Sequence, residues 1–131
     1  MKSAGILVDT YAWMEILKNS VWGNHALAVI EQSIPVYISV LTLYELQYRL
    51  EEEYGHDVAS TRIRTIRSHT ETIPVDEQIA SLAGLIKFEQ KRKKSKMGAV
   101  DCMILATARV HDLKVLTGDR HFKGLAESIQ I

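Results

Sequence analysis

Four acidic residues stand beside apolar segments and could together hold a metal ion. Asp9 ends an apolar run near the N-terminus, and Asp101 lies near the start of the most apolar run of the chain, residues 97–108. A buried carboxylate is costly unless it is paired, protonated or bound to a metal. Glu45 lies within a predicted helix, and Asp119 follows a predicted strand by two residues. These four residues are therefore the candidate metal ligands and catalytic residues.

If these carboxylates converge, their mutual repulsion favours a bound cation. Two unit charges about 4 Å apart repel by roughly 4 kcal/mol at an effective dielectric constant near 20. The ligands would be hard oxygens, and the five scattered histidines and the single cysteine show no metal-binding spacing. Mg²⁺ or Mn²⁺ is therefore favoured over Zn²⁺. Such a site suits phosphodiester hydrolysis, because the metal can activate water and stabilise charge on the attacking and leaving oxygens.

Short apolar runs alternate with amphipathic segments along the chain. The sequence predicts strands at residues 5–9, 36–39, 72–75, 113–117 and 128–131, and helices at 10–18, 22–32, 40–54, 57–69, 76–92, 99–110 and, as a single turn, 121–125. Pro74 would confine the third strand to an edge. The alternation implies an α/β fold, with a mainly parallel sheet covered on both faces. Ligands of such sheets bind outside the carboxyl ends of the strands, where the acids could meet.

The predicted helix at residues 40–54 places Glu45 on its apolar side. Leu41, Tyr44 and Tyr48 lie at helical spacing and share one stripe with Glu45. We therefore predict that the two tyrosines are core or interface aromatics, and that Glu45 is not a fully solvated side chain.

The composition is that of an ordinary globular protein, and we predict one domain spanning residues 1–131. Lys plus Arg and Asp plus Glu both number 16, so the formal net charge is 0 and any nucleic-acid contact must come from a local patch. The basic run 91–96 provides one. The single cysteine fits a reducing cytosol, and no apolar run is long enough to span a bilayer. These features predict a cytoplasmic protein without membrane contact.

Four segments resemble the motifs of the PIN domain family, in the order and spacing of the small VapC-type toxins of toxin–antitoxin pairs. They are Ile6-Leu7-Val8-Asp9-Thr10, Ser39-Val40-Leu41-Thr42-Leu43-Tyr44-Glu45-Leu46, Asp101-Cys102-Met103-Ile104-Leu105-Ala106-Thr107-Ala108 and Leu116-Thr117-Gly118-Asp119-Arg120-His121-Phe122. An acid after an apolar strand is common, so each motif alone is weak. The four in order are specific, and the resemblance covers essentially the whole chain.

The resemblance implies a three-layer α/β/α fold with about five parallel strands and a metal-dependent endoribonuclease. Asp9, Glu45 and Asp101 match the three core acids of the family, and Asp119 matches its more variable fourth acid. Thr117 matches the small hydroxyl residue that is often found in the last motif. The expected cofactor is Mg²⁺ or Mn²⁺.

The resemblance also implies partners. RNA would be the substrate, and a small antitoxin protein would silence the toxin of a type II pair. A helical hairpin from residue 40 to about 69 would serve homodimer formation and antitoxin binding. The basic residues before the third motif would face RNA, and the candidates there are Arg92, Lys94 and Lys96.

Each acid also has a purely structural interpretation. Asp9 could cap the following helix, and Asp101 could simply be favoured by the dipole at a helix N-terminus. Asp119 could be a turn residue, and Glu45 a partly exposed helix residue. The basic run 91–96 could be a solvated helix end.

Other functions remain open within the same resemblance. They are an RNA-processing PIN nuclease without a toxin role and a non-catalytic PIN module that binds RNA or a partner. More distant classes fit poorly: a phosphatase of the haloacid dehalogenase type needs an acid where Tyr11 stands. A dinucleotide-binding fold is disfavoured because no Gly-x-Gly-x-x-Gly follows a strand.

Overall fold

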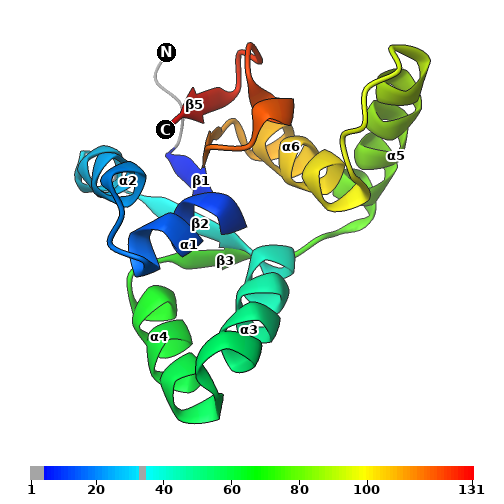
Figure 1. Ribbon diagram of the computed structural model, residues 1–131. Coiled ribbons are helices and arrows are strands. Elements are labelled where there is room, and N and C mark those ends of the chain that lie inside the picture. The colour runs from blue at the N-terminus through cyan, green and yellow to red at the C-terminus, as the bar shows by residue number, and fades with distance from the viewer. Residues whose placement is uncertain (1–4, 33–34) are drawn as a thin grey trace.

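The computed structural model describes residues 5–32 and 35–131 and contains a five-stranded sheet between two layers of helices (Figure 1). All neighbouring strands are parallel, in the order β3-β2-β1-β4-β5. The strands are β1 (Ile6–Val8), β2 (Val36–Ser39), β3 (Glu71–Ile73), β4 (Lys114–Thr117) and β5 (Ser128–Gln130). The predicted three-layer fold with about five parallel strands is confirmed.

The helices lie close to the predicted segments. They are α1 (Thr10–Leu17), α2 (Val21–Glu31), α3 (Val40–Tyr54), α4 (His56–Ser68), α5 (Glu77–Arg92), α6 (Ala99–His111) and the short 3₁₀ helix η1 (Arg120–Phe122). Within residues 5–32 and 35–131, none of them is both long and apolar enough to cross a membrane.

Strand β1 is the centre of the sheet and contributes to both halves of the core. Ile6 and Val8 pack with α1, α2, α3 and α4 on one face, whereas Leu7 packs with α5 and α6 on the other. This division follows from the alternation of side chains along a strand. Because β2 and β4 flank β1, the residue after β1 emerges at the middle of the carboxyl edge of the sheet. That residue is Asp9.

Strand β3 lies at one edge of the sheet, as the proline predicted. The strand ends at Ile73, one residue earlier than Pro74. The missing N–H of the proline therefore removes no hydrogen bond from the ladder.

The buried side of α3 is not the predicted one. Tyr44 and Tyr48 are 70% and 58% exposed, so of the two roles predicted for them a place in the core is excluded, and an interface role stays a prediction. The buried residues instead lie four apart, at Thr42, Leu46 and Leu50. Glu45 lies between the buried and exposed sides and is only partly exposed.

Helices α3 and α4 form an antiparallel hairpin that projects from the sheet (Figure 1). Gly55 joins them with a φ of 84°, a conformation that favours glycine. The predicted hairpin from residue 40 to about 69 is therefore present. Its outer surface carries the exposed Tyr44 and Tyr48.

Replacement by alanine is predicted to have opposite effects on stability at two glycines. A Cβ atom on Gly23 in α2 would lie 2.2 Å from the carbonyl oxygen of Glu15 in α1, whereas one on Gly84 in α5 would meet open space. We expect Gly84→Ala to stabilise the protein by about 1 kcal/mol through helix propensity. Gly23→Ala should destabilise it by about 1–3 kcal/mol, because the clash pushes two helices apart. Thermal unfolding measures both, and equal effects would contradict the close α1–α2 contact.

Candidate metal centre

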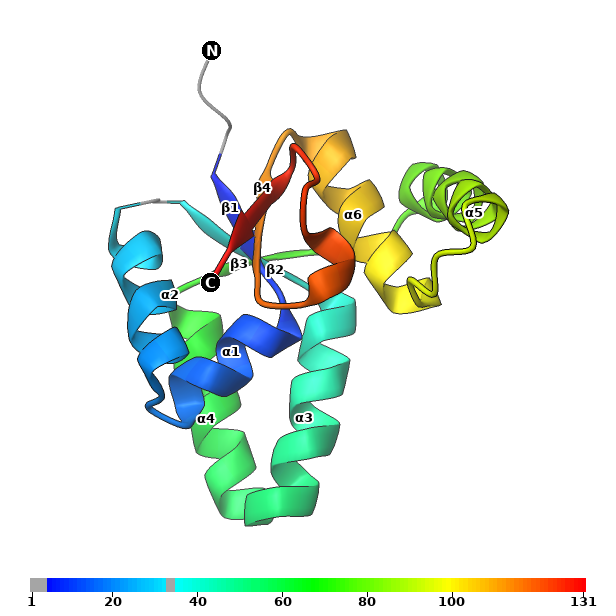
Figure 2. The ribbon, with the colours of Figure 1, turned by 45° about the horizontal axis from the view of Figure 1, so that its top comes forward.

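A cleft of about 180 Å³ opens at the carboxyl edge of β1 and β4. The start of α1, the middle of α3, the start of α6 and the segment before η1 gather there (Figure 2). Its lining consists of Asp9, Thr10, Tyr11, Glu45, Arg49, Asp101, Ile104 and Asp119. The fold therefore brings the four predicted acids to one place. A larger hollow of about 500 Å³ lies between α3 and α4, but no carboxylate lines it.

Asp9 is held rigidly at the floor of the cleft. Its Oδ1 atom accepts a hydrogen bond of 3.0 Å from the backbone N–H of Ala12, which makes it the N-cap of α1. Its own N–H donates to the carbonyl oxygen of Leu116 in β4. The residue is 6% exposed, and this burial raises the pKa of its carboxyl from 3.8 to about 7. A hydrogen bond from Thr117 opposes part of the increase.

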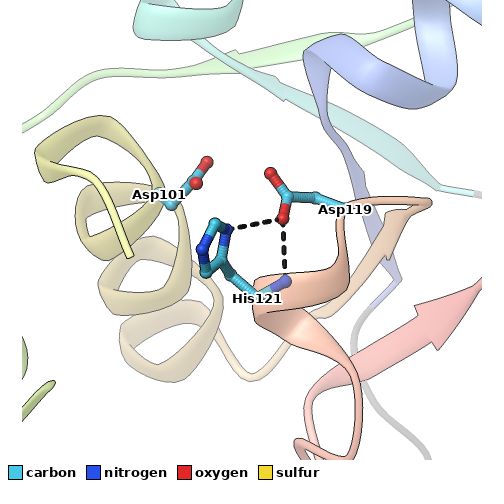
Figure 3. A group of neighbouring side chains, drawn as sticks. All are labelled: Asp101, Asp119 and His121. Carbon is cyan, nitrogen blue, oxygen red and sulfur yellow. Dashed lines mark hydrogen bonds and ion pairs between the residues drawn. The ribbon is translucent and has the colours of Figure 1, made fainter. Parts of the chain in front are cut away.

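Asp101, Asp119 and His121 form a tight group on the other side of the cleft (Figure 3). One ligand atom from each lies within 4.8 Å of the other two. The Oδ1 atom of Asp119 accepts a 2.8 Å hydrogen bond from the backbone N–H of His121 and lies 2.9 Å from its Nδ1 atom. Asp101 is partly buried in the first turn of α6. Burial, followed by the charge of Asp119, raises its pKa to about 6.

Glu45 reaches the cleft from the second turn of α3. Its Oε1 atom accepts a 2.7 Å hydrogen bond from the hydroxyl of Thr10 at the start of α1. This bond orients the carboxylate and ties α3 to the residue that follows Asp9. The negative charge of Glu45 also contributes to the raised pKa of Asp101.

Thr117 lies beneath the acids and does not line the cleft. It is fully buried, and its Oγ1 atom accepts a 2.9 Å hydrogen bond from the backbone N–H of Asp119. The same hydroxyl hydrogen-bonds Asp9. Thr117 therefore positions two of the acids from below, and a direct catalytic role for it stays a prediction.

Three residues at the site had not been identified from the sequence. His121 stands two residues after Asp119, and its position in a one-turn helix was the available signal. Arg49 stands four residues after Glu45, so helical spacing would have placed it on the same face. Tyr11 immediately follows the first motif and needed the tertiary structure to reveal its place at the cleft.

The basic run does not reach this cleft. Arg92, Lys94 and Lys96 are exposed, and none of them lines it. The guanidinium of Arg92 instead lies 5.8 Å from the ring centre of Phe88. RNA contact by these three residues stays a prediction.

The donor atoms of the cleft fit a divalent cation. Within the described residues, no Lys or Arg forms an ion pair with Asp9, Glu45, Asp101 or Asp119. The raised pKa values of Asp9 and Asp101 show that burial and mutual repulsion disfavour their ionised forms. A cation bound among these oxygens would remove that penalty. Carboxylate oxygens suit Mg²⁺ or Mn²⁺, and the imidazole of His121 is a further possible donor beside Asp101 and Asp119.

Comparison with known proteins agrees with this geometry. A family model for the PIN domain matches residues 6–128. The chain belongs to the PIN domain family. Its relatives include Ribonuclease VapC4 of Mycobacterium tuberculosis, which is 26% identical over 92 residues that span 69% of this chain and 71% of the relative.

Solved structures confirm the PIN-type fold. VapBC-1 of nontypeable Haemophilus influenzae aligns with a TM-score of 0.80 at 17% identity, over 95% of this chain and 96% of that one. VapBC-5 of M. tuberculosis, a member of the VapBC family of toxin–antitoxin systems, aligns with a TM-score of 0.67 at 26% identity, over 98% of each chain. This PIN protein is thus similar to VapC-type toxins, and its family supports a nuclease.

The burial of Asp9 predicts an unusual dependence of stability on pH in the metal-free protein. The pKa of its carboxyl is about 7 in the folded protein, against 3.8 for an aspartate exposed to water, so protonation stabilises the fold. This stabilisation is complete below about pH 4 and is lost as the pH rises through about 7. Asp9→Asn removes the charge but keeps the oxygen that caps α1. With EDTA present, we expect this variant to be more stable than the parent at pH 8.

Measuring Asp9→Asn and the parent over a range of pH tests this prediction. The difference in melting temperature between Asp9→Asn and the parent should shrink as the pH falls from 8 to 5. Asp9→Ala is the matched control, because loss of the cap should cost about 1 kcal/mol relative to Asp9→Asn at every pH. A difference that does not change with pH would mean that Asp9 is not protonated on acidification.

Proposed function

We propose that this PIN protein is a metal-dependent endoribonuclease that hydrolyses RNA phosphodiester bonds, and that it is the toxin of a type II toxin–antitoxin pair. The observation that carries the proposal is the convergence of Asp9, Glu45, Asp101 and Asp119 on one cleft. Membership of the PIN family and the similarity to Ribonuclease VapC4 support the same activity.

The four carboxylates would hold Mg²⁺ or Mn²⁺, with His121 as a further donor beside Asp101 and Asp119. When bound, such an ion activates water and stabilises charge on the phosphate oxygens. The protein supplies the geometry. Thr10 orients Glu45, and Thr117 fixes Asp9 and the backbone of Asp119, so that the carboxylates are held in place before the substrate arrives.

Arg49 is the proposed phosphate-binding residue of the cleft. It lines the same wall as Glu45, one helical turn further along α3, and is exposed. Within the described residues, its guanidinium forms no ion pair. A guanidinium beside a metal site can hold a phosphate with two parallel hydrogen bonds. It also offsets the repulsion between an acidic cleft and an anionic RNA.

The toxin role rests on the solved relatives, several of which are toxin–antitoxin complexes. We infer a small antitoxin as partner and a homodimer, with the α3–α4 hairpin as the contact region and the cytoplasm as the location. The exposed tyrosines of that hairpin, Tyr44 and Tyr48, support a protein contact there. An RNA-processing role without toxicity predicts instead that expression does not arrest growth.

The metal requirement is tested on the purified protein with a long unstructured RNA. We expect cleavage with Mn²⁺ or Mg²⁺, none with EDTA, and a loss of at least about 100-fold in Asp101→Asn. Mn²⁺ should raise the melting temperature of the parent more than that of Asp101→Asn, because one ligand is missing. Asp57→Asn is the matched control, since Asp57 also lies in the first turn of a helix but not in the cleft.

Two results would overturn this account. One is equal RNA cleavage in EDTA and in Mn²⁺. The other is an unfolded Asp101→Asn protein together with a parent whose melting temperature does not respond to metal, which would make Asp101 a structural residue. RNA binding without cleavage in saturating Mn²⁺ would instead favour a non-catalytic PIN module.

The proposed role of Arg49 also predicts how RNA affinity depends on salt concentration. Removing one phosphate contact should reduce the slope of log affinity against log salt concentration by about 0.7 for single-stranded RNA. We therefore expect Arg49→Gln to bind RNA more weakly and with a smaller slope, measured in the non-cleaving Asp101→Asn background. Its Mn²⁺ affinity, measured with Asp101 intact, should be unchanged or tighter, because a positive charge is lost. Weakened Mn²⁺ binding would contradict the assignment of Arg49 to phosphate binding.

Lys94→Gln, assayed in the same way, tests whether the basic run 91–96 contacts RNA.

A further inference from the structure

Tyr11 stands at the entrance of the acidic cleft without a role in the metal site. It is the second residue of α1 and lines the cleft together with Asp9 and Asp119. The three residues that follow it, 12–14, are buried in the core, whereas Tyr11 is 44% exposed. Within the described residues, the hydroxyl of Tyr11 has no hydrogen-bond partner. An aromatic ring is therefore presented to solvent beside the carboxylates.

Gly118 gives this ring a rigid support. A Cβ atom on Gly118 would lie 2.2 Å from Cε1, 2.6 Å from Cδ1 and 2.9 Å from Cζ of Tyr11, so the ring rests directly against the glycine backbone. Gly118 does not have a positive φ, and the residue is required for space. Its neighbours are fixed as well: Thr117 belongs to β4, and the N–H of Asp119 is bonded to the Thr117 hydroxyl. The ring thus has one supported side and one open side.

The negative charge of the cleft means that RNA binding needs an uncharged contact such as this ring. The carboxylates repel the phosphates of RNA, so substrate binding needs attractive contacts that do not involve these acids. Arg49 on α3 supplies a positive charge, and Tyr11 on α1 supplies a surface for a base. One base stacked on an aromatic side chain strengthens binding by about fivefold to 150-fold, with little dependence on which base it is. A ring that is already held in place loses little freedom on binding.

We propose that Tyr11 is the stacking platform for one unpaired base of the RNA next to the scissile phosphate, and that Gly118 holds the ring in position for it. The proposal rests on the endoribonuclease function and adds a requirement on the substrate. A base inside a duplex is already stacked on its neighbours, so the nucleotide at Tyr11 must be unpaired. Tyr11 acts through base contact, and neither the metal nor the reacting atoms depend on it.

The test uses the full chain with Asp101→Asn, which keeps RNA intact, and a fluorescent single strand of mixed sequence, about twelve nucleotides long. We expect Tyr11→Ala to weaken binding by about fivefold to 150-fold, and Tyr11→Phe to bind as the parent does. Trp22→Ala is the matched control, because Trp22 is also an exposed aromatic at the second position of a helix but lies outside the cleft. It should bind unchanged. The same RNA in a perfect duplex should bind every variant as weakly as Tyr11→Ala binds the single strand.

Gly118→Ala tests the support without changing the tyrosine. The added methyl group should displace the ring and weaken binding, but it should have no further effect when combined with Tyr11→Ala. The Mn²⁺ affinity of both single variants, measured with Asp101 intact, should equal that of the parent. Additive losses in the double variant, or weaker Mn²⁺ binding, would mean that Gly118 acts on the metal site instead.

The outcomes also separate this proposal from the proposed function. Metal-dependent cleavage by the parent together with full RNA binding by Tyr11→Ala would overturn the role of Tyr11 and leave the nuclease intact. Equal binding of duplex and single strand would do the same. A parent that neither cleaves nor binds RNA would overturn both.

Discussion

The constraint that the rest of the structure must satisfy is the burial of neighbouring carboxylates at the carboxyl edge of the sheet. Asp9 and Asp101 are both partly or fully buried at the carboxyl edge of the sheet, and burial is the main reason that their pKa values are raised, to about 7 and about 6. No ion pair with Lys or Arg relieves this charge within residues 5–32 and 35–131. The surrounding protein must therefore stabilise an unfavourable site, and the packing of β1, β4 and α6 supplies that stability. A divalent cation is the counter-charge that such a site lacks.

The structural and functional interpretations of the acids are compatible for Asp9 and Asp119. Asp9 caps α1 through Oδ1, and Asp119 uses its Oδ1 atom to accept from the backbone of His121. A carboxylate has two oxygens, so one can fix the side chain to the backbone while the other remains a potential ligand. The N-terminal ends of α1 and η1 thus orient the ligands as well as tolerate their charge.

Different residues of the cleft have different roles. The acids line several sides of the cleft, and hydroxyl groups hold three of them: Thr10 orients Glu45, and Thr117 holds Asp9 and the backbone of Asp119. The positive charge of Arg49 and the ring of Tyr11 come from two different helices. Because the formal net charge of the chain is 0, the overall field does not attract RNA. Recognition of the proposed RNA substrate must therefore come from local contacts of this kind, close to the acids that would otherwise repel it.

The sequence by itself was enough to predict the strands, the helices and the four acids that meet at the sheet edge, because each of these features follows from a local pattern of residues. Apolar runs and helical spacing identify buried strands and helices, and parallel strands bring the residues after them to one edge. Three features were decided only by the tertiary structure. The core-facing side of α3 is set by Thr42, Leu46 and Leu50, since which of two stripes is buried depends on the surface that the helix meets. The basic run 91–96 was adjacent to the third motif in sequence, yet none of the predicted RNA-facing residues lines the cleft. The place of Tyr11 against Gly118 follows from a contact between segments far apart in the chain, which no local pattern records. Arg49 and His121 had local signals, but only the tertiary structure shows that both lie beside the acids.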